Sequence, residues 1–351
     1  MNEPVDFVLT WVNGNDPDWQ ADFNQYSAQN KQLNGTDKFR DWDNLQYLFR
    51  AFEKFTPWVN KIYFITYGHL PDWLNTDHPK LHVVNHKDYM ASQNLPVFSS
   101  HPIEINMHRI PGLSERFVYF NDDCFLLKPM AKEAFFKQGL PLDAAICNIM
   151  NDGNIAPIVL NCIDLLNKNF NRHKGQKLTK NQIIRKHFWK WFHPTYGTKM
   201  LDTLLLMNWH VFSGFVDFHQ PQAFLKTTFE HVWAAEPEVL ERTSASKFRD
   251  NRDINQYLFR YWQLVNGNFQ PDSYKNAFKA RKRVELRKVK DAERACEDLV
   301  SGQYSVYCLN DAMTKGRFTQ QDVTPEGIAY SIDILKKALD KVLPEASEFE
   351  R

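Results

Sequence analysis

Two adjacent acids at the end of an apolar segment are the residues of this chain best suited to chemistry. Asp122 and Asp123 follow the segment 116–120, RFVYF, whose aromatic and β-branched residues predict a buried strand. Ligands of open α/β sheets bind beyond the carboxyl ends of the strands. We therefore expect the two carboxylates to face a ligand, and a metal ion held on a diphosphate suits them. A solvated turn is the alternative, because Asn121 and two Asp residues also favour turns.

Two other predicted strands also end in acids. The segment 5–12 leads into a turn that contains Asp16, and the segment 305–309 leads into Asn310 and Asp311. Magnesium in proteins usually takes one or two carboxylates and completes its shell with phosphate oxygens and water. A Mg²⁺ or Mn²⁺ site is therefore predicted from Asp122, Asp123 and Asp311.

Arginine and histidine side chains supply the charge that a diphosphate needs. Arg40, Arg116 and Arg249 are candidates for bracing phosphate oxygens. His219 is the candidate proton carrier, because the ordinary pKa of histidine, about 6.5, suits an acid or a base. Arg40 and Arg249 lie in two copies of one pattern, Phe-Arg-Asp followed by Gln-Tyr-Leu-Phe-Arg. Phosphoryl transfer needs little beyond positioned charges of this kind.

A second polar cluster lies between residues 95 and 116. His101, Glu104 and His108 have the i, i+3, i+7 spacing of one helical face, and Arg109 follows. Zinc is the less favoured interpretation because the spacing lacks the HExxH pattern. We predict instead a face that hydrogen-bonds a sugar or a nucleotide.

The order of predicted elements favours a largely parallel α/β sheet. Strands are expected at 5–12, 61–67, 81–84 and 116–121, with a helix over 41–55 and another before the last of these strands. Residues 143–212 have weaker patterning and are predicted to form an insertion with an amphipathic helix at 180–191. Further helices are predicted at 221–239, 253–264, 275–295 and 328–342.

Composition narrows the partners and the compartment. The 43 Lys and Arg residues balance 42 acids, which argues against nucleic acid as a partner. Aromatic residues make up 14% of the chain and suit platforms that stack on sugars or bases. Five Cys residues without a CxxC pair predict reduced thiols. We find no signal peptide and no apolar run of membrane-spanning length, so the chain is expected to be soluble. The basic helix predicted at 275–295 leaves peripheral membrane association open, although a solvated face is favoured.

Four separated blocks of this sequence resemble the Stealth proteins, which include bacterial capsular polysaccharide phosphotransferases and the animal N-acetylglucosamine-1-phosphotransferase. The blocks are DFVLTWVNGNDP at 6–17, FRDWDNLQYLFRAFEKFTPWVNKIYFITYGHLPDWL at 39–74 with LPVFSSHPIEINMHRIPGLSERFVYFNDDCFLLKP at 95–129, HQPQAFLKTTFEHVW with SKFRD between 219 and 250, and YCLNDAM at 307–313. They occur in the family's order and cover roughly half of the chain.

The resemblance implies an α/β, Rossmann-like fold with a mostly parallel sheet similar to the GT-A core of nucleotide-sugar transferases. It implies a catalytic core at 1–142 and 213–313, a mainly helical insertion at 143–212 on the acceptor side, and a helical tail at 314–351. The positions that match the family's essential residues are Asp16, Asp123, His219 and Arg249. Substrate-binding residues are predicted to be Asn13, Gly14, Arg40, Asp41, His101, Glu104, His108, Arg109, Arg116, Asn121 and Asn310.

The activity implied is transfer of a hexose 1-phosphate, N-acetylhexosamine 1-phosphate being favoured, from a UDP-sugar to a glycan or lipid-linked acceptor, with release of UMP. His219 is the preferred general base and Asp16 its rival. Two alternatives stay open: a metal-dependent glycosyltransferase that releases UDP, and a non-catalytic module that binds glycans. A bacterial cytoplasmic location, at the inner face of the membrane, is expected.

Overall fold

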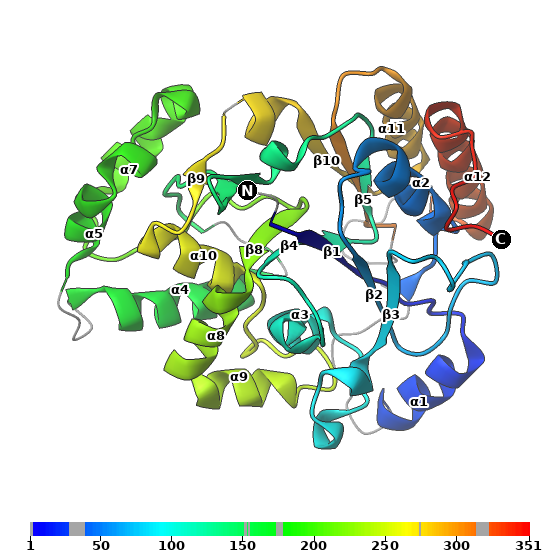
Figure 1. Cartoon of the computed structure of the whole chain (residues 1–351), viewed down its shortest axis with the longest axis horizontal. Helices are drawn as coiled ribbons and strands as arrows, with labels where there is room; N and C mark the ends of the chain where they lie inside the picture. Colours follow the sequence, from blue (N-terminus) through cyan, green and yellow to red (C-terminus); the bar gives the residue numbers. More distant parts are fainter. Residues whose placement is uncertain are drawn as a thin grey trace.

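The computed structural model describes residues 3–27, 39–150, 153, 155–172, 178–273, 275–313 and 323–351 (Figure 1). The sequence Asn34-Gly35-Thr36, expected to be a plain turn, lies outside these residues. Helices and strands are interspersed along the chain, and helices pack on both faces of a central sheet.

The central sheet has five strands in the order β3-β2-β1-β4-β8. The first four in sequence are parallel, and only β8 runs antiparallel, against β4. Their bounds are β1 Val5–Thr10, β2 Ile62–Thr66, β3 Leu81–Asn85, β4 Arg116–Asn121 and β8 Gln222–Leu225. This topology confirms the predicted α/β, mostly parallel, Rossmann-like sheet.

Side chains of the strands alternate between the two faces of the sheet, and each face has its own hydrophobic core. Phe7 of β1 packs on one face of the sheet with Phe52 of helix α2 (Leu45–Phe55), their ring centroids being 5.1 Å apart. Val8 points to the other face, where it joins the cluster that contains Leu258 of helix α10 (Tyr257–Asn266). Both faces of the sheet are therefore dry, which explains why its strands read as continuous apolar runs.

A second sheet places the last strand beside the acids that follow β4. It has the order β10-β11-β5, from strands Arg281–Leu286, Val306–Asp311 and Cys124–Leu126. β10 and β11 are parallel, whereas β5 is antiparallel to β11. The backbone N–H of Leu309 donates to the carbonyl of Asp123 over 2.8 Å. Because of this pairing, the end of β11 lies next to the end of β4.

The remaining elements surround these sheets. A third small sheet joins β6 (Phe136–Lys137), β7 (Leu140–Asp143) and β9 (Gln270–Pro271). Other α-helices are α1 Pro17–Ser27, α3 Ser100–Ile105, α8 Lys226–Ala235, α9 Pro237–Ser244, α11 Val289–Val300 and α12 Pro325–Val342. Short 3₁₀ segments are His86–Asp88, Ser92–Asn94, Met107–Arg109, Lys132–Ala134 and Pro194–Lys199, and Lys275–Lys279 is a π-helical turn.

The predicted insertion contains helices α4 (Ala156–Phe170), α5 (Lys180–Lys186), α6 (Phe188–Trp191) and α7 (Met200–Leu206). The single amphipathic helix predicted at 180–191 is wrong in one respect, because it divides at His187. His187 has φ −112° and ψ 33°, outside the helical region, and ends one helix while it begins the next.

Two other helix predictions need correction. Residues 222–225 form strand β8 ahead of helix α8, and residues 281–286 form strand β10 ahead of helix α11. In both places the strand forms because a distant partner, β4 or β11, satisfies its backbone hydrogen bonds. The local pattern of charged and apolar residues gives no information about that partner.

The thiols and the helices agree with two simple expectations. All five Cys residues are free, and four of them are buried. Within the described ranges, no helix is both long enough and apolar enough to cross a membrane.

Candidate active site

A cleft of about 690 Å³ opens where the ends of β4 and β11 meet, and it collects side chains from distant parts of the chain. The predicted chemistry depends on five residues. Four of them line the cleft, namely Asp123, His219, Arg249 and Asp311, and the fifth, Asp16, does not. Arg40, Asp41, Asp122 and Asn310, which were also predicted, line the same cleft. Sequence reasoning missed Asp217, Tyr257, Arg283 and Glu285 in its wall.

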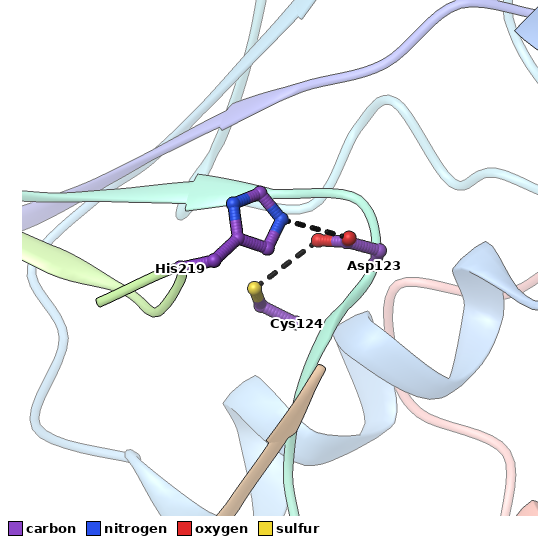
Figure 2. A group of neighbouring side chains, drawn as sticks. All are labelled: Asp123, Cys124 and His219. Carbon is purple, nitrogen blue, oxygen red and sulfur yellow. Dashed lines mark hydrogen bonds and ion pairs between the residues drawn. The ribbon is translucent and has the colours of Figure 1, made fainter. Parts of the chain in front are cut away.

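Asp123 and His219 form a close pair in this cleft (Figure 2). The Nε2 atom of His219 lies 2.9 Å from Oδ2 of Asp123, and the thiol of Cys124 donates to Oδ1 over 3.2 Å. The Asp123 carboxylate raises the pKa of His219 above its usual 6.5, against the effect of burial. Desolvation disfavours the Asp123 anion, but His219, Cys124 and Asn310 outweigh it and lower its pKa to about 2.

The pair therefore stabilises the imidazolium, and His219 can act as a base only in its neutral form, above its raised pKa, with its one ring proton on Nε2. Asp123 accepts from the Nε2–H, so Nδ1 is the ring nitrogen that remains for another partner, and it has no hydrogen bond within the described part of the chain. A carboxylate that fixes one ring nitrogen and orients the other is the arrangement that general acid–base catalysis uses.

Asp122 keeps exposed surface in the cleft, and its surroundings are acidic. Loss of hydration, together with the nearby charges of Asp123 and Asp41, raises the pKa of its carboxyl to about 7. Burial likewise raises the pKa of Asp41. Neighbouring carboxylates repel one another, so this part of the cleft is suited to a cation.

Asp311 is already paired. Its Oδ2 accepts from Arg40 over 2.7 Å and from the Trp42 indole over 3.1 Å, while its Oδ1 accepts from the backbone of Met313. Burial still raises the pKa of Asp311 above its usual range. Asp311 holds Arg40 in the cleft wall, and a direct role as metal ligand would require this ion pair to break.

Arginines approach the cleft from three elements. Arg40 precedes α2 and Arg249 precedes α10, so the two copies of the repeated sequence pattern place equivalent side chains in one cleft. Arg283 comes from β10 and donates to Asn310 over 3.1 Å. Guanidinium groups that converge on a cavity are suited to the oxygens of a phosphate.

The loop that carries His219 is anchored by a buried arginine. Arg260 of α10 is completely buried and contacts both carboxylate oxygens of Asp143, and its Nη1 lies 2.6 Å from Asp217. Tyr261 also donates to Asp217, but burial dominates and raises the pKa of Asp217 to about 6. Asp217 lies two residues before His219, and this proximity to a predicted catalytic residue was the available signal for it.

A smaller cavity of about 200 Å³ adjoins the cleft, because Trp11, Asp122 and Arg249 line both. Aromatic side chains dominate its wall: Trp11, Trp19, Phe39, Tyr67 and Phe98. Asn121, predicted to bind substrate, also lines it and accepts from the Tyr119 hydroxyl. Its place beyond the ends of β1 and β2 and its flat apolar groups suit a nucleobase.

In the loop after β1, Trp11 and Val12 line the smaller cavity, whereas Asn13, Gly14 and Asp16 line neither cavity. Oδ1 of Asp16 accepts from the backbone of Trp19 over 2.8 Å and so caps helix α1. Asn13 donates its backbone N–H to His69, and Gly14 donates to the carbonyl of Phe39. A Cβ on Gly14 would lie 2.3 Å from that carbonyl, so only glycine allows the segment bearing Arg40 to approach.

Arg116 was predicted to brace phosphate oxygens, but the structure does not bring it to either cavity. It is the first residue of β4, whereas Asn121 at the other end of the strand reaches the cavities. Six residues of strand span roughly 17–20 Å. Arg116 instead donates to the carbonyl of Gly139 and pairs with Glu3.

The polar face predicted from His101, Glu104, His108 and Arg109 is not brought to the cleft either. None of its four residues lines either cavity. His101 contacts Asp253, Glu104 accepts from the backbone of Gln256, His108 is buried beside Phe229 and Trp233, and Arg109 lies over the Trp233 ring. Burial lowers the pKa of His108 to about 3, so it is neutral. These side chains contribute to the packing of α3 and the following 3₁₀ segment against α8, α9 and the start of α10, and the buried Nδ1 of His108 has no hydrogen-bond partner among the described residues.

The acids fit a hard divalent cation in part. Within the described residues, the cluster with the closest ligand atoms at this cleft is Asp123, Cys124 and His219. The Cys124 thiol does not suit Mg²⁺ or Mn²⁺, since burial raises its pKa well above the usual value and keeps it protonated. Asp122 and Asp123 offer the oxygen ligands such a cation prefers, and substrate phosphates and water complete the shell in most magnesium sites.

Comparison with known proteins identifies the family. Residues 3–31 match the model for Stealth protein CR1, conserved region 1, and residues 38–142 match that for CR2, conserved region 2. The capsular polysaccharide phosphotransferase WcwK of Streptococcus pneumoniae is 36% identical over 99% of this chain and 98% of its own. The receptor polysaccharide phosphotransferase WefC of Streptococcus oralis is 37% identical over the full length of both chains. This chain belongs to the Stealth family.

As a Stealth protein it is a transferase enzyme, like the phosphotransferases it matches. Family membership gives no support to the non-catalytic alternative. Among solved structures, the galactosyltransferase LgtC in complex with donor and acceptor sugar analogs covers 98% of both chains, with 7% identity and a TM-score of 0.38. The fold assignment rests on the strand order above, not on this distant match.

Proposed function

We propose that this Stealth enzyme transfers a hexose 1-phosphate from a UDP-sugar to a hydroxyl group of a growing surface polysaccharide, forming a phosphodiester and releasing UMP. One observation carries the proposal: an imidazole–carboxylate pair, further carboxylates and several guanidinium groups line one cleft that opens into an aromatic cavity. The phosphotransferase names of the full-length relatives support the same reaction class.

The two cavities would each bind a different part of a nucleotide sugar. The uracil base would lie among the aromatic side chains of the smaller cavity, and the diphosphate would pass Arg249, which lines both. Arg40, held by Asp311, would then brace the non-bridging oxygens of the transferred phosphate. Met150, Ile155 and Val159 of the insertion line the other side of the cleft, which supports an acceptor site there.

The chemistry is an in-line displacement at the β-phosphorus. The acceptor oxygen forms a bond to this phosphorus as the bond to the bridging oxygen breaks, and UMP leaves with the bridging oxygen. His219 would take the hydroxyl proton at Nδ1 while Asp123 holds Nε2. Asp16 is the weaker candidate for base, because its carboxylate caps α1 and does not line the cleft.

A divalent cation would add to this site. Asp122 and Asp123 would hold Mg²⁺ or Mn²⁺, which neutralises the charge that develops on the departing nucleotide. Asp41 adds a third carboxylate to the same wall and favours the cation electrostatically.

The released nucleotide decides between this proposal and its alternative. The protein is incubated with a panel of UDP-sugars, UDP-N-acetylglucosamine first, that carry label in both the sugar and the β-phosphate, together with a lipid-linked glycan acceptor. Joint transfer of both labels with release of UMP supports the proposal. Transfer of the sugar label alone with release of UDP contradicts it and indicates a glycosyltransferase.

A matched pair of variants ties the product to the site. His219→Gln removes the proton carrier from the cleft. His193→Gln changes the histidine that caps the 3₁₀ segment Pro194–Lys199 and whose hydrogen bonds and ring contacts, among the described residues, are with Thr195 and Tyr196. UMP release should disappear in the first variant and persist in the second. Equal loss in both would show that the assay reports folding instead of chemistry.

A further inference from the structure

We infer that the outer face of helices α5, α6 and α7 is a docking surface for an anionic phospholipid bilayer. Six large apolar side chains on these helices and just after them are exposed: Phe188, Trp189, Leu201, Leu204, Leu205 and Trp209. Trp189 is 75% exposed and Leu205 is 76% exposed, which is far more than scattered surface residues require. This inference does not depend on the proposed reaction.

Helices α6 and α7 are apolar on both sides, which a water-facing helix is not, whereas α5 presents Gln182, Arg185 and Lys186 outward. On the inner side, Ile183 and Ile184 of α5, Trp191 of α6 and Leu206 of α7 pack against the core beneath the sheet. The buried Thr203 of α7 accepts from the backbone of Cys147. Since the inner side is complete, the exposed leucines of α7 have no packing role in the fold, and a helix that is apolar all round is suited to a second apolar environment.

The exposed leucines share one face of their helix. Leu201, Leu204 and Leu205 have the i, i+3 and i+4 spacing that lines up side chains along α7, and Trp209 follows one turn later. The first residue of α5 binds the last turn of α7, because the ammonium of Lys180 donates to the carbonyl of Leu206. Figure 1 shows α5 and α7 along one edge of the molecule, opposite α11 and α12.

The positive charge of this face favours an anionic occupant. Residues 178–212 contain five basic side chains and one acid, Asp202. Lys180 and Lys190 donate inward to backbone carbonyls and Lys199 pairs with Asp202, so Arg185 and Lys186 supply the charge of the outer face. Arg185 and Lys186 are exposed and form no ion pair within the described residues, whereas the whole chain is almost neutral. Basic residues beside exposed Trp and Leu are the composition of helices that lie in the interface of anionic membranes. A second copy of this chain would bring two positive faces together, which electrostatics disfavours.

The position of this face relative to the cleft gives docking a purpose. Ile155 and Val159, at the start of α4 in the same insertion, line the cleft, and Leu160 beside them is exposed. An insertion held in the headgroup layer would present the cleft to acceptors carried on lipid.

Vesicle sedimentation of the full chain tests the inference without any substrate. Wild-type protein should sediment with vesicles of phosphatidylcholine and phosphatidylglycerol, bind phosphatidylcholine alone more weakly, and lose affinity as salt is raised. The double variant Leu204→Ser/Leu205→Ser should bind about tenfold more weakly or worse. The double variant Arg185→Gln/Lys186→Gln should lose about fivefold per charge, and only with anionic vesicles.

Control variants separate this face from general surface apolarity. Val300→Ser and Tyr330→Ser change side chains of α11 and α12 with 47% exposure each, and both should bind vesicles like wild type. Circular dichroism must show that all variants are folded. The inference is overturned if wild type fails to sediment with anionic vesicles, or if the leucine variant binds as wild type does. Light scattering that shows a dimer broken by the leucine variant would equally overturn it and assign the face to a second copy.

Discussion

The protonation of His219 is controlled by a single carboxylate. Asp123 raises the pKa of His219 above 6.5, and His219 helps to lower that of Asp123 to about 2. The resulting stabilisation is present between about pH 3.8 and 6.5. It is lost as pH falls through the depressed pKa of Asp123 and as pH rises through the raised pKa of His219.

Asp123→Asn should therefore lower the pKa of His219 and weaken the dependence of stability on pH in both windows. The reason is that an amide offers the imidazolium no charge. The measurement is a titration of the His219 ring proton by NMR in metal-free buffer, with thermal unfolding recorded from pH 3 to pH 9 in parallel. An unchanged midpoint for His219 in the variant would contradict the pairing.

The two candidate bases differ in what their removal should do. His219→Gln should lower kcat by roughly 10²–10⁴-fold, since this is the usual contribution of a general base, and should also lose the pH-dependent stabilisation of the pair with Asp123. Asp16→Ala should cost about 1 kcal/mol of unfolding free energy through loss of the helix cap, whereas Asp16→Asn keeps a capping side chain. Chemical denaturation and pH–rate profiles measure both effects. If Asp16→Asn abolishes the pH dependence at full stability, Asp16 is the base.

At the scale of elements, loops and buried pairs set the position of these side chains. Gly14 lets the loop after β1 contact Phe39, and Arg40 follows directly. Gly14→Ala should displace this segment, raise the KM for the donor several-fold and lower the melting temperature. Asn15→Ala is the control, because Asn15 is the next residue and its side chain is exposed. This variant should leave the KM for the donor and the melting temperature unchanged. Steady-state kinetics with varied donor, together with calorimetry, give the comparison.

Arg260 has a comparable role for the loop of His219. Arg260→Met leaves Asp143 and Asp217 without their buried partner and should cost roughly 3–5 kcal/mol of unfolding free energy. Arg260→Lys keeps the charge but not the planar fork, so it should recover only part of that loss and should still show a lower kcat. Urea unfolding and kinetics on both variants test this. Equal stability of Arg260→Met and wild type would exclude the anchoring role.

Local sequence patterns predicted the elements that are stabilised by nearby residues or by a generally apolar environment. The four parallel strands follow from apolar runs ended by turns, and α2 follows from apolar residues at helical spacing. β8 and β10 were missed because each exists through pairing with a strand far away in sequence. The structural contacts of the polar face of α3 could not be predicted for the same reason. The partners of His101 and Glu104 lie 152 residues later in the sequence.

At the scale of the whole molecule, strand direction explains which site residues could be predicted. Asp123 and Asp311 follow or end their strands, so both reach the cleft. Arg116 begins its strand, and the same rule would have excluded it. Asp16 obeys the rule as well, yet its carboxylate turns to α1, and strand order alone does not determine where a loop side chain points.

The two joined cavities and the acidic wall lead to a prediction about binding. Loss of hydration in the cleft and the neighbouring acids raise the pKa of Asp122 to about 7, so the folded protein binds an extra proton between about pH 3.8 and 7, and its stability falls as pH rises through this range. A divalent cation should relieve this repulsion, and UDP, which the proposed function places across both cavities, should bind more tightly with it. We therefore expect UDP with Mn²⁺ to raise the melting temperature more than the two separate shifts combined, and more at pH 8 than at pH 6. A ligand at about 100 times its Kd stabilises a fold by about 2.7 kcal/mol, which calorimetry resolves. Asp122→Asn should remove the cation effect but keep part of the UDP effect, while a cation effect unchanged in this variant would place the metal elsewhere.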